Sequence, residues 1–206
     1  MRGRAILAAV VLISVLFLVM ITQGGAFDDV RKNAWYEESV AYVSEHQLMT
    51  GVAENKFYPD GPVSRGMLVT ILYRMEGSPA APQTMPFGDV PSDAYYADAV
   101  AWAADAGIVS GYSERSFAPV DSVTREQVAA VLYRYAQKTG AVGAVEVSLS
   151  DYQDAETISP YARDAMAWAI ASHVLEGTKA DTLAPKSETT RAQVAAIIMR
   201  YHSAIR

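Results

Sequence analysis

Three arginines of this sequence share one recurring position, directly after a hydroxyl residue that opens a helical pattern. The pairs are Ser64–Arg65, Thr124–Arg125 and Thr190–Arg191. Because Ser and Thr are favoured N-caps, each arginine is expected at the first helical position, where a cation opposes the positive end of the helix dipole. An unfavourable choice made three times indicates a role other than helix formation. A guanidinium beside the free N–H groups of a helix start can bind a carboxylate, so these residues predict an anion-binding site.

Two other interpretations of the three arginines stay open. Each could pair with an aspartate of the same chain, or lie in solvent as isolated surface arginines commonly do. A second set stands nine residues further along, at Arg74, Arg134 and Arg200. These lie near the expected helix C-termini, where a cation suits the dipole, so the pattern favours a structural role for them.

An aspartate and an aromatic residue precede each arginine at nearly constant spacing. The aspartates are Asp29, Asp89 and Asp154. The aromatic residues are Trp35, Tyr95 and Tyr161. The carboxylates could stabilise a turn or hydrogen-bond sugar hydroxyls. The aromatic rings could lie against a sugar ring or pack between neighbouring segments. Both alternatives remain open for both residue types.

Glycines and capping residues mark where the helices begin and end. Gly51, Gly111 and Gly177 each stand 14 residues before one of the first set of arginines. They are expected to end a preceding helix with a positive φ. Gln127 and Gln193 follow Thr124 and Thr190 by three residues and predict capping boxes, whereas Met67 breaks the box of the first copy.

The elements that position these residues form three copies of one unit, at 27–78, 87–140 and 149–206, joined by segments around 77–86 and 139–150. Each unit is expected to contain an Ala-rich helix, a turn and a second helix with an apolar stripe. The stripes are Leu68, Ile71, Leu72 and Met75; Val128, Val131, Leu132 and Tyr135; and Val194, Ile197, Ile198 and Tyr201. One such hairpin cannot bury enough surface alone, so the sequence predicts an all-α fold with one core shared by three helix-turn-helix repeats.

Composition excludes several classes of function. The chain has no cysteine, three histidines at unrelated repeat positions, and a formal net charge of -6. It offers no clustered metal ligands, no phosphate-binding glycine loop and no nucleophile motif, so we expect neither a cofactor nor an enzyme. The acidic charge argues against nucleic acid as a partner.

The first 26 residues have a different character. Arg2 and Arg4 precede an apolar stretch over 5–21, and small residues follow at 24–26. This layout predicts a secretory signal peptide at 1–26, with an uncleaved membrane anchor as the alternative. In either case the three units are expected outside the cytoplasm.

Taken together, these motifs resemble the S-layer homology family. The resemblance rests on FDDV at 27–30 and FGDV at 87–90, on the glycine turns, and on the T-R-A-E-like segments that contain the first set of arginines. It covers residues 27–206 and implies a pseudo-threefold, spindle-like helical fold. It also implies non-covalent anchoring to the bacterial cell wall through a secondary cell-wall polysaccharide, commonly pyruvylated, bound in grooves between repeats.

The resemblance also implies which residues contact the glycan. They are the aspartates, aromatic residues, turn glycines and first set of arginines named above. Because the first copy keeps Trp35 but loses its capping box, the sites are expected to differ in strength. The alternative is an extracellular protein–protein scaffold or an accessory subunit that binds no glycan, and membrane contact is expected only if residues 1–26 stay attached.

Overall fold

Residues 27–143 and 147–204 are described by the computed structural model, and the expected signal peptide at 1–26 lies outside them. Across those two ranges the regular structure is helical, with a few isolated β-bridges between loops, which confirms the all-α prediction. None of the helices within these ranges has the length and apolarity to cross a membrane.

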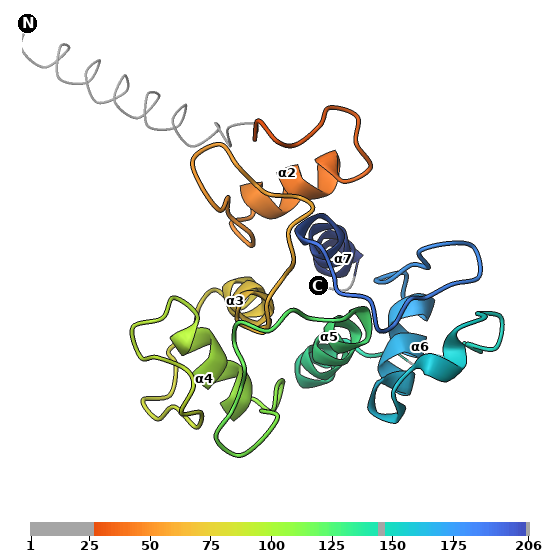
Figure 1. The fold of residues 1–206 in the computed structure, drawn as a ribbon. Helices are drawn as coiled ribbons and strands as arrows, with labels where there is room; N and C mark the ends of the chain where they lie inside the picture. Colours follow the sequence, from red (N-terminus) through yellow and green to blue (C-terminus); the bar gives the residue numbers. More distant parts are fainter. Residues whose placement is uncertain (1–26, 144–146, 205–206) are drawn as a thin grey trace, which may run out of the picture.

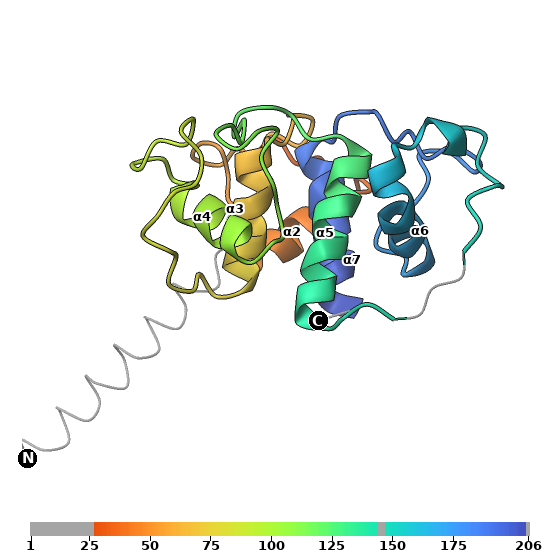
Figure 2. The same ribbon diagram turned by 90° about the horizontal axis from the view of Figure 1, so that it is seen from below.

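Three longer helices stand at the centre of the molecule and three shorter ones surround them (Figure 1). The central helices are α3 (Arg65–Met75), α5 (Arg125–Thr139) and α7 (Arg191–Ala204). The peripheral helices are α2 (Glu37–Glu45), α4 (Ala97–Asp105) and α6 (Arg163–Ala171), with two single-turn 3₁₀ helices, η1 (Ala155–Thr157) and η2 (Pro160–Ala162), before α6. Seen from the side, the central helices run along one common direction, and long loops cover the end at which they begin (Figure 2).

Each central helix packs against the peripheral helix of the next unit. The contacting pairs are α3 with α4, α5 with α6, and α7 with α2. The last pair joins the third unit back to the first and closes the ring. We call these contacts interface 1 (α3–α4), interface 2 (α5–α6) and interface 3 (α7–α2).

The central helices begin where the sequence predicts. Ser64 caps α3 by accepting from the Met67 N–H at 3.2 Å. Thr124 and Gln127 form the predicted capping box of α5. At α7, Gln193 Oε1 accepts from the Thr190 N–H at 3.1 Å, and the Gln193 N–H donates to Thr190 Oγ1 at 3.3 Å. These two hydrogen bonds form the predicted capping box.

The predicted apolar stripes form the core. Leu72, Leu132 and Ile198 occupy one equivalent position and are completely buried. The aromatic residues of the stripes meet near the centre, where the rings of Tyr135 and Tyr201 lie 5.7 Å apart. Burying this one surface requires all three units, so the repeats depend on each other for their stability.

A closed ring of backbone hydrogen bonds joins the segments that lead into the central helices. The Val63 N–H donates to the Thr189 carbonyl, the Thr189 N–H to the Val123 carbonyl, and the Val123 N–H to the Val63 carbonyl, at 2.9–3.1 Å. Within this ring, each unit therefore donates one hydrogen bond and accepts one. This ring fixes the starts of α3, α5 and α7 relative to one another.

The expectation that Gly51, Gly111 and Gly177 adopt a positive φ is wrong. The left-handed residues that follow the peripheral helices are Gln47, Gly107 and His173. The three turn glycines instead allow the chain to approach itself closely. A Cβ added at Gly111 would lie 2.4 Å from the Ser116 carbonyl oxygen and 2.5 Å from that of Ser113.

Candidate functional site

The first set of arginines reaches across from one unit to the next. Arg191 of the third unit donates through Nε to the Phe57 carbonyl and through Nη2 to the Thr50 carbonyl of the first unit, both at 2.7 Å. The other two arginines repeat the geometry. Arg65 contacts the carbonyls of Phe117 and Ser110, and Arg125 contacts those of Leu183 and Glu176.

None of these arginines forms an ion pair with an aspartate among the described residues, and two of the three are removed from solvent. Arg125 and Arg191 are buried, and burial lowers the pKa of both guanidinium groups. Arg65 is half-buried, and its guanidinium carbon lies 4.5 Å from the centre of the Tyr112 ring. The hydrogen bonds use Nε and Nη2, so Nη1 is the guanidinium nitrogen without a protein acceptor among the described residues.

The free N–H groups expected at these helix starts are not free. At α7 the Arg191 N–H donates to the Gly61 carbonyl at 2.8 Å and the Ala192 N–H to the Pro59 carbonyl at 2.9 Å. The starts of α3 and α5 are satisfied in the same way by loops of the following unit. An anion at this end of the molecule must therefore be held by side chains, because the backbone donors of the helix starts are already used.

The aspartates stabilise the loops that the arginines contact. Asp29 accepts from the N–H groups of Phe57 and Tyr58 at 2.9 and 2.8 Å. Partial burial acts to raise the pKa of Asp29, but these N–H donors outweigh it and lower the pKa. Asp89 and Asp154 make the equivalent contacts in their own units. Of the two roles considered for the aspartates, the structure thus shows the turn.

The three aromatic residues project into solvent. Trp35 is 65% exposed, Tyr95 64% and Tyr161 55%. Packing between repeats, the alternative considered for them, does not describe Trp35 and Tyr95 at this exposure, whereas Tyr161 also donates through its hydroxyl to Glu126 of the second unit. Each stands just before a peripheral helix, and therefore beside the central helix on which that peripheral helix packs.

A cavity of about 330 Å³ opens at interface 1, and we call it groove 1. All three units contribute to its lining. Tyr95 comes from the second unit and Arg191 from the third, while Thr50, Met67, Thr70 and Arg74 come from the first. No residue that lines groove 1 is acidic. The groove therefore combines an exposed aromatic ring with two cations.

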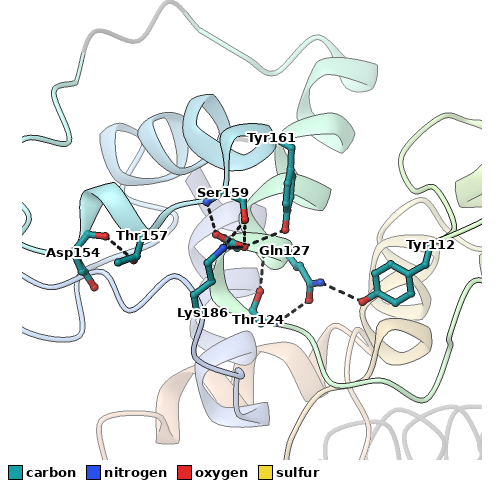
Figure 3. Close-up of polar contacts among 9 residues, drawn as sticks. Tyr112, Thr124, Gln127, Asp154, Thr157, Ser159, Tyr161 and Lys186 are labelled. Carbon is teal, nitrogen blue, oxygen red and sulfur yellow. Dashed lines mark hydrogen bonds and ion pairs between the residues drawn. The ribbon is translucent and has the colours of Figure 1, made fainter.

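Interface 2 has the corresponding residues but a more extensive internal network (Figure 3). The figure shows Gln127 lying between Tyr112 and Tyr161, and Gln127 Nε2 donates to Tyr112 Oη at 3.2 Å. The Tyr161 hydroxyl donates to Glu126 at 3.3 Å, and Lys186 contacts the same carboxylate at 2.6 Å. Partial desolvation and the Glu126 carboxylate raise the pKa of Tyr161 to about 12.

Interface 3 differs in charge. Trp35 precedes α2, which packs on α7, and Arg125 reaches the backbone of Glu176. The Glu176 carboxylate pairs with Arg200 of α7 at 2.6 Å. Arg200 therefore contacts an acid, whereas Arg74, its counterpart in groove 1, donates to the Leu48 carbonyl at 3.2 Å.

The structure brings the predicted site residues together only in part. An aromatic residue of one unit and an arginine of another line groove 1 together. The aspartates and turn glycines instead stabilise the loops behind the arginines. Thr50 and Arg74 were not predicted as groove residues. The repeat of Arg74 nine residues after each first arginine was the signal that could have identified it.

Comparison with known proteins agrees with the repeat pattern. The family model described as the S-layer homology domain matches residues 26–66, 86–129 and 151–195. A surface-layer 125 kDa protein of Lysinibacillus sphaericus is 29% identical over 187 residues, which cover 89% of this chain and 15% of that protein.

Two further relatives are an endoglucanase and a cellulosome-anchoring protein. An endoglucanase of Bacillus sp. (strain KSM-635) is 31% identical over 172 residues, which cover 84% of this chain and 18% of the endoglucanase. A cellulosome-anchoring protein of Acetivibrio thermocellus is 24% identical over 127 residues, which cover 58% of this chain and 28% of that protein. The chain thus spans less than a third of each of these relatives.

Proposed function

The chain belongs to the S-layer homology domain family, and on that premise we propose that it binds a secondary cell-wall polysaccharide in grooves between its repeats and so anchors non-covalently at the bacterial cell wall. The domain of this family is an anchoring module and not a catalytic one. The relatives named for a surface layer and for cellulosome anchoring support a location at the cell surface.

The observation that carries the proposal is the composition of groove 1. An exposed ring, Tyr95, offers its face to a sugar and keeps its hydroxyl at the edge. Arg74 and Arg191 place two positive charges in the same cavity. A ligand that combines a sugar ring with a negative charge fits this lining, and a pyruvate ketal on a wall sugar supplies that charge as a carboxylate.

Arg191 has a double role in this proposal. Its Nε and Nη2 hold the Phe57 and Thr50 carbonyls, which fixes the position and plane of the guanidinium. Nη1 then remains to donate to a ligand carboxylate. A guanidinium held by the protein in this way is already positioned for its ligand, so binding requires little further ordering.

Sedimentation with purified cell walls tests the proposal. The protein is expected to bind intact walls, and the bound fraction is expected to fall to background when the secondary polymer is removed with hydrofluoric acid. Walls treated with mild acid, which hydrolyses the ketal and leaves the sugar chain, should bind with an intermediate loss. Equal binding to intact and stripped walls would contradict glycan recognition and favour a protein receptor.

A soluble ligand provides the complementary measurement. A wall disaccharide that carries the pyruvate ketal should bind in a calorimetric titration, and the same disaccharide without the ketal should bind at least about tenfold more weakly. Equal affinities for the two disaccharides would show that the carboxylate is not recognised.

A further inference from the structure

The three interfaces place three different side chains beside equivalent arginines. The residue whose carbonyl accepts from the arginine Nη2 is Thr50 at interface 1, Ser110 at interface 2 and Glu176 at interface 3. Because the backbone contact is the same, the three side chains start from equivalent points. Two of these side chains are neutral hydroxyl groups, and the third is a carboxylate.

The Glu176 carboxylate contacts Arg200, which is the counterpart at interface 3 of the groove 1 cation Arg74. Arg200 pairs with Glu176 at 2.6 Å, whereas Arg74 lines groove 1 among residues of which none is acidic. Arg125, the counterpart of Arg191, donates to the backbone of the same Glu176. At interface 3 one cation, Arg200, is thus paired with a carboxylate of the chain itself, and the other, Arg125, is hydrogen-bonded to the backbone of the residue that carries this carboxylate.

We propose that groove 1 binds the anionic sugar and that Glu176 closes interface 3 to it, so Glu176 decides where on the molecule the glycan binds. This inference rests on the proposed glycan-binding function. A ligand carboxylate at interface 3 would have to displace the Glu176 side chain from Arg200 and would lie close to a like charge. At groove 1 the same ligand meets a hydroxyl, a ring and two cations.

The exposure of the Glu176–Arg200 pair makes the inference testable without disturbing the fold. The Glu176 side chain is 59% exposed and that of Arg200 32%, so their ion pair contributes little to folding. Thr50 is also exposed. Substitutions at Glu176 and at Thr50 therefore report on binding rather than on stability.

A reciprocal exchange of the two residues tests the inference. Glu176→Thr removes the carboxylate from interface 3, and Thr50→Glu places one in groove 1 beside Arg74. The probe is the wall disaccharide with its pyruvate ketal, titrated by calorimetry so that the number of bound molecules is measured. The disaccharide without the ketal serves as the matched control ligand.

Glu176→Thr is expected to add one binding event to the number measured for the wild-type protein, and Thr50→Glu to weaken one event by about tenfold or more. Tyr95→Ala should remove an event from the wild-type protein, whereas Trp35→Ala should leave it unchanged. In the Glu176→Thr background, Trp35→Ala should remove the added event. Thermal unfolding of every variant is the control that tests whether each variant is folded.

The outcomes separate this inference from the function on which it rests. If neither the wild-type protein nor Glu176→Thr binds the ketal-bearing disaccharide, the proposed function fails and the inference fails with it. If the wild-type protein binds, but Trp35→Ala weakens binding as much as Tyr95→Ala, the function stands and the inference is overturned. An unchanged number of sites in Glu176→Thr overturns it as well.

Discussion

The guanidinium of Arg191 lies 4.4 Å from the centre of the Phe57 ring and donates to the Phe57 carbonyl at 2.7 Å. The two residues are separated by 134 positions and belong to the last and first units. Phe57 is completely buried, and its N–H donates to Asp29. One peptide segment is thus held by a carboxylate of its own unit and by an arginine of another.

Replacement of this arginine should therefore destabilise the fold. Arg191→Ala removes a buried side chain and leaves the carbonyls of Phe57 and Thr50 without their donors. The expected loss is about 2–4 kcal/mol in the free energy of unfolding, measured by urea denaturation. Arg65→Ala, at the half-buried equivalent, should cost less, and equal stability of Arg191→Ala and the wild type would contradict the structural role.

This expectation changes how binding variants should be chosen. A loss of glycan binding in an Arg→Ala variant at these positions would not distinguish a missing ligand contact from a misplaced loop. The exposed residues Tyr95 and Thr50 are better probes, because their side chains are not buried in the core and do not hold a loop of another unit as Arg191 does.

The aspartate turns should make the protein sensitive to acid. The pKa of Asp89 is acted on first by partial burial, which raises it, but the N–H groups of Phe117 and Ala118 and the Ser116 hydroxyl outweigh burial and lower it. A carboxyl whose pKa is lower in the folded state contributes stability that is complete above its unfolded pKa of about 3.9 and is lost as the pH falls through the folded value. Unfolding midpoints in urea should therefore drop below about pH 4.

Asp89→Asn tests the source of this acid sensitivity. The amide keeps one acceptor oxygen but cannot accept at both positions, so the variant should be less stable by about 1–2 kcal/mol at neutral pH. Its midpoint should also fall less steeply between pH 4 and pH 2.5. A slope identical to that of the wild type would assign the acid sensitivity to other carboxylates.

The positions that follow sequence-local rules were predicted well. Thr124 and Gln127 lie three residues apart, so their capping box depends on the local sequence alone. The buried stripe from Leu68 to Met75 follows from the spacing of apolar residues at the period of an α-helix. These features require no knowledge of how the units are arranged. The family resemblance supplied the threefold arrangement, which periodicity alone does not contain.

The residues that act between units were harder to predict. Arg191 finds its acceptors at positions 50 and 57, and no local pattern indicates that the third unit reaches back to the first. The N–H groups of the helix starts were predicted to be free for an anion because their backbone acceptors lie in the following unit, which no local pattern indicates. For the same reason the charge of Glu176 could not be interpreted until Arg200 was placed beside it.

The first unit should gain stability from the capping box that it lacks. Met67→Gln would let the new amide accept from the Ser64 N–H, as Gln127 does from the Thr124 N–H at 2.9 Å. The expected gain is about 0.5–1 kcal/mol in the free energy of unfolding. Gln127→Met is the matched reverse exchange and should cost a similar amount, and a gain from both exchanges would show that helix capping does not control this position.

The turn glycines should tolerate no side chain, although their φ angles are ordinary. A Cβ on Gly111 would lie 2.7 Å from Phe87 Cε1, in addition to its short distances from two carbonyl oxygens. Backbone and a buried ring cannot move aside easily, so Gly111→Ala should lower the free energy of unfolding by about 1–3 kcal/mol. The melting temperature should fall by about 2–4 °C for each kcal/mol in a domain of this size.

Gly143 offers the matched control for the turn glycine. It lies between the second and third units, and an added Cβ there would have no described atom within 4 Å apart from those of its chain neighbours. Gly143→Ala should therefore leave the melting temperature unchanged or raise it slightly, because alanine restricts the unfolded chain more than glycine does. If Gly111→Ala were as stable as Gly143→Ala, the close approach of the loop would not be what requires glycine at position 111. If only Gly111→Ala is destabilised, the glycine acts by holding the loop that presents Ser110 to Arg65, since Ser110 is its direct neighbour in the chain.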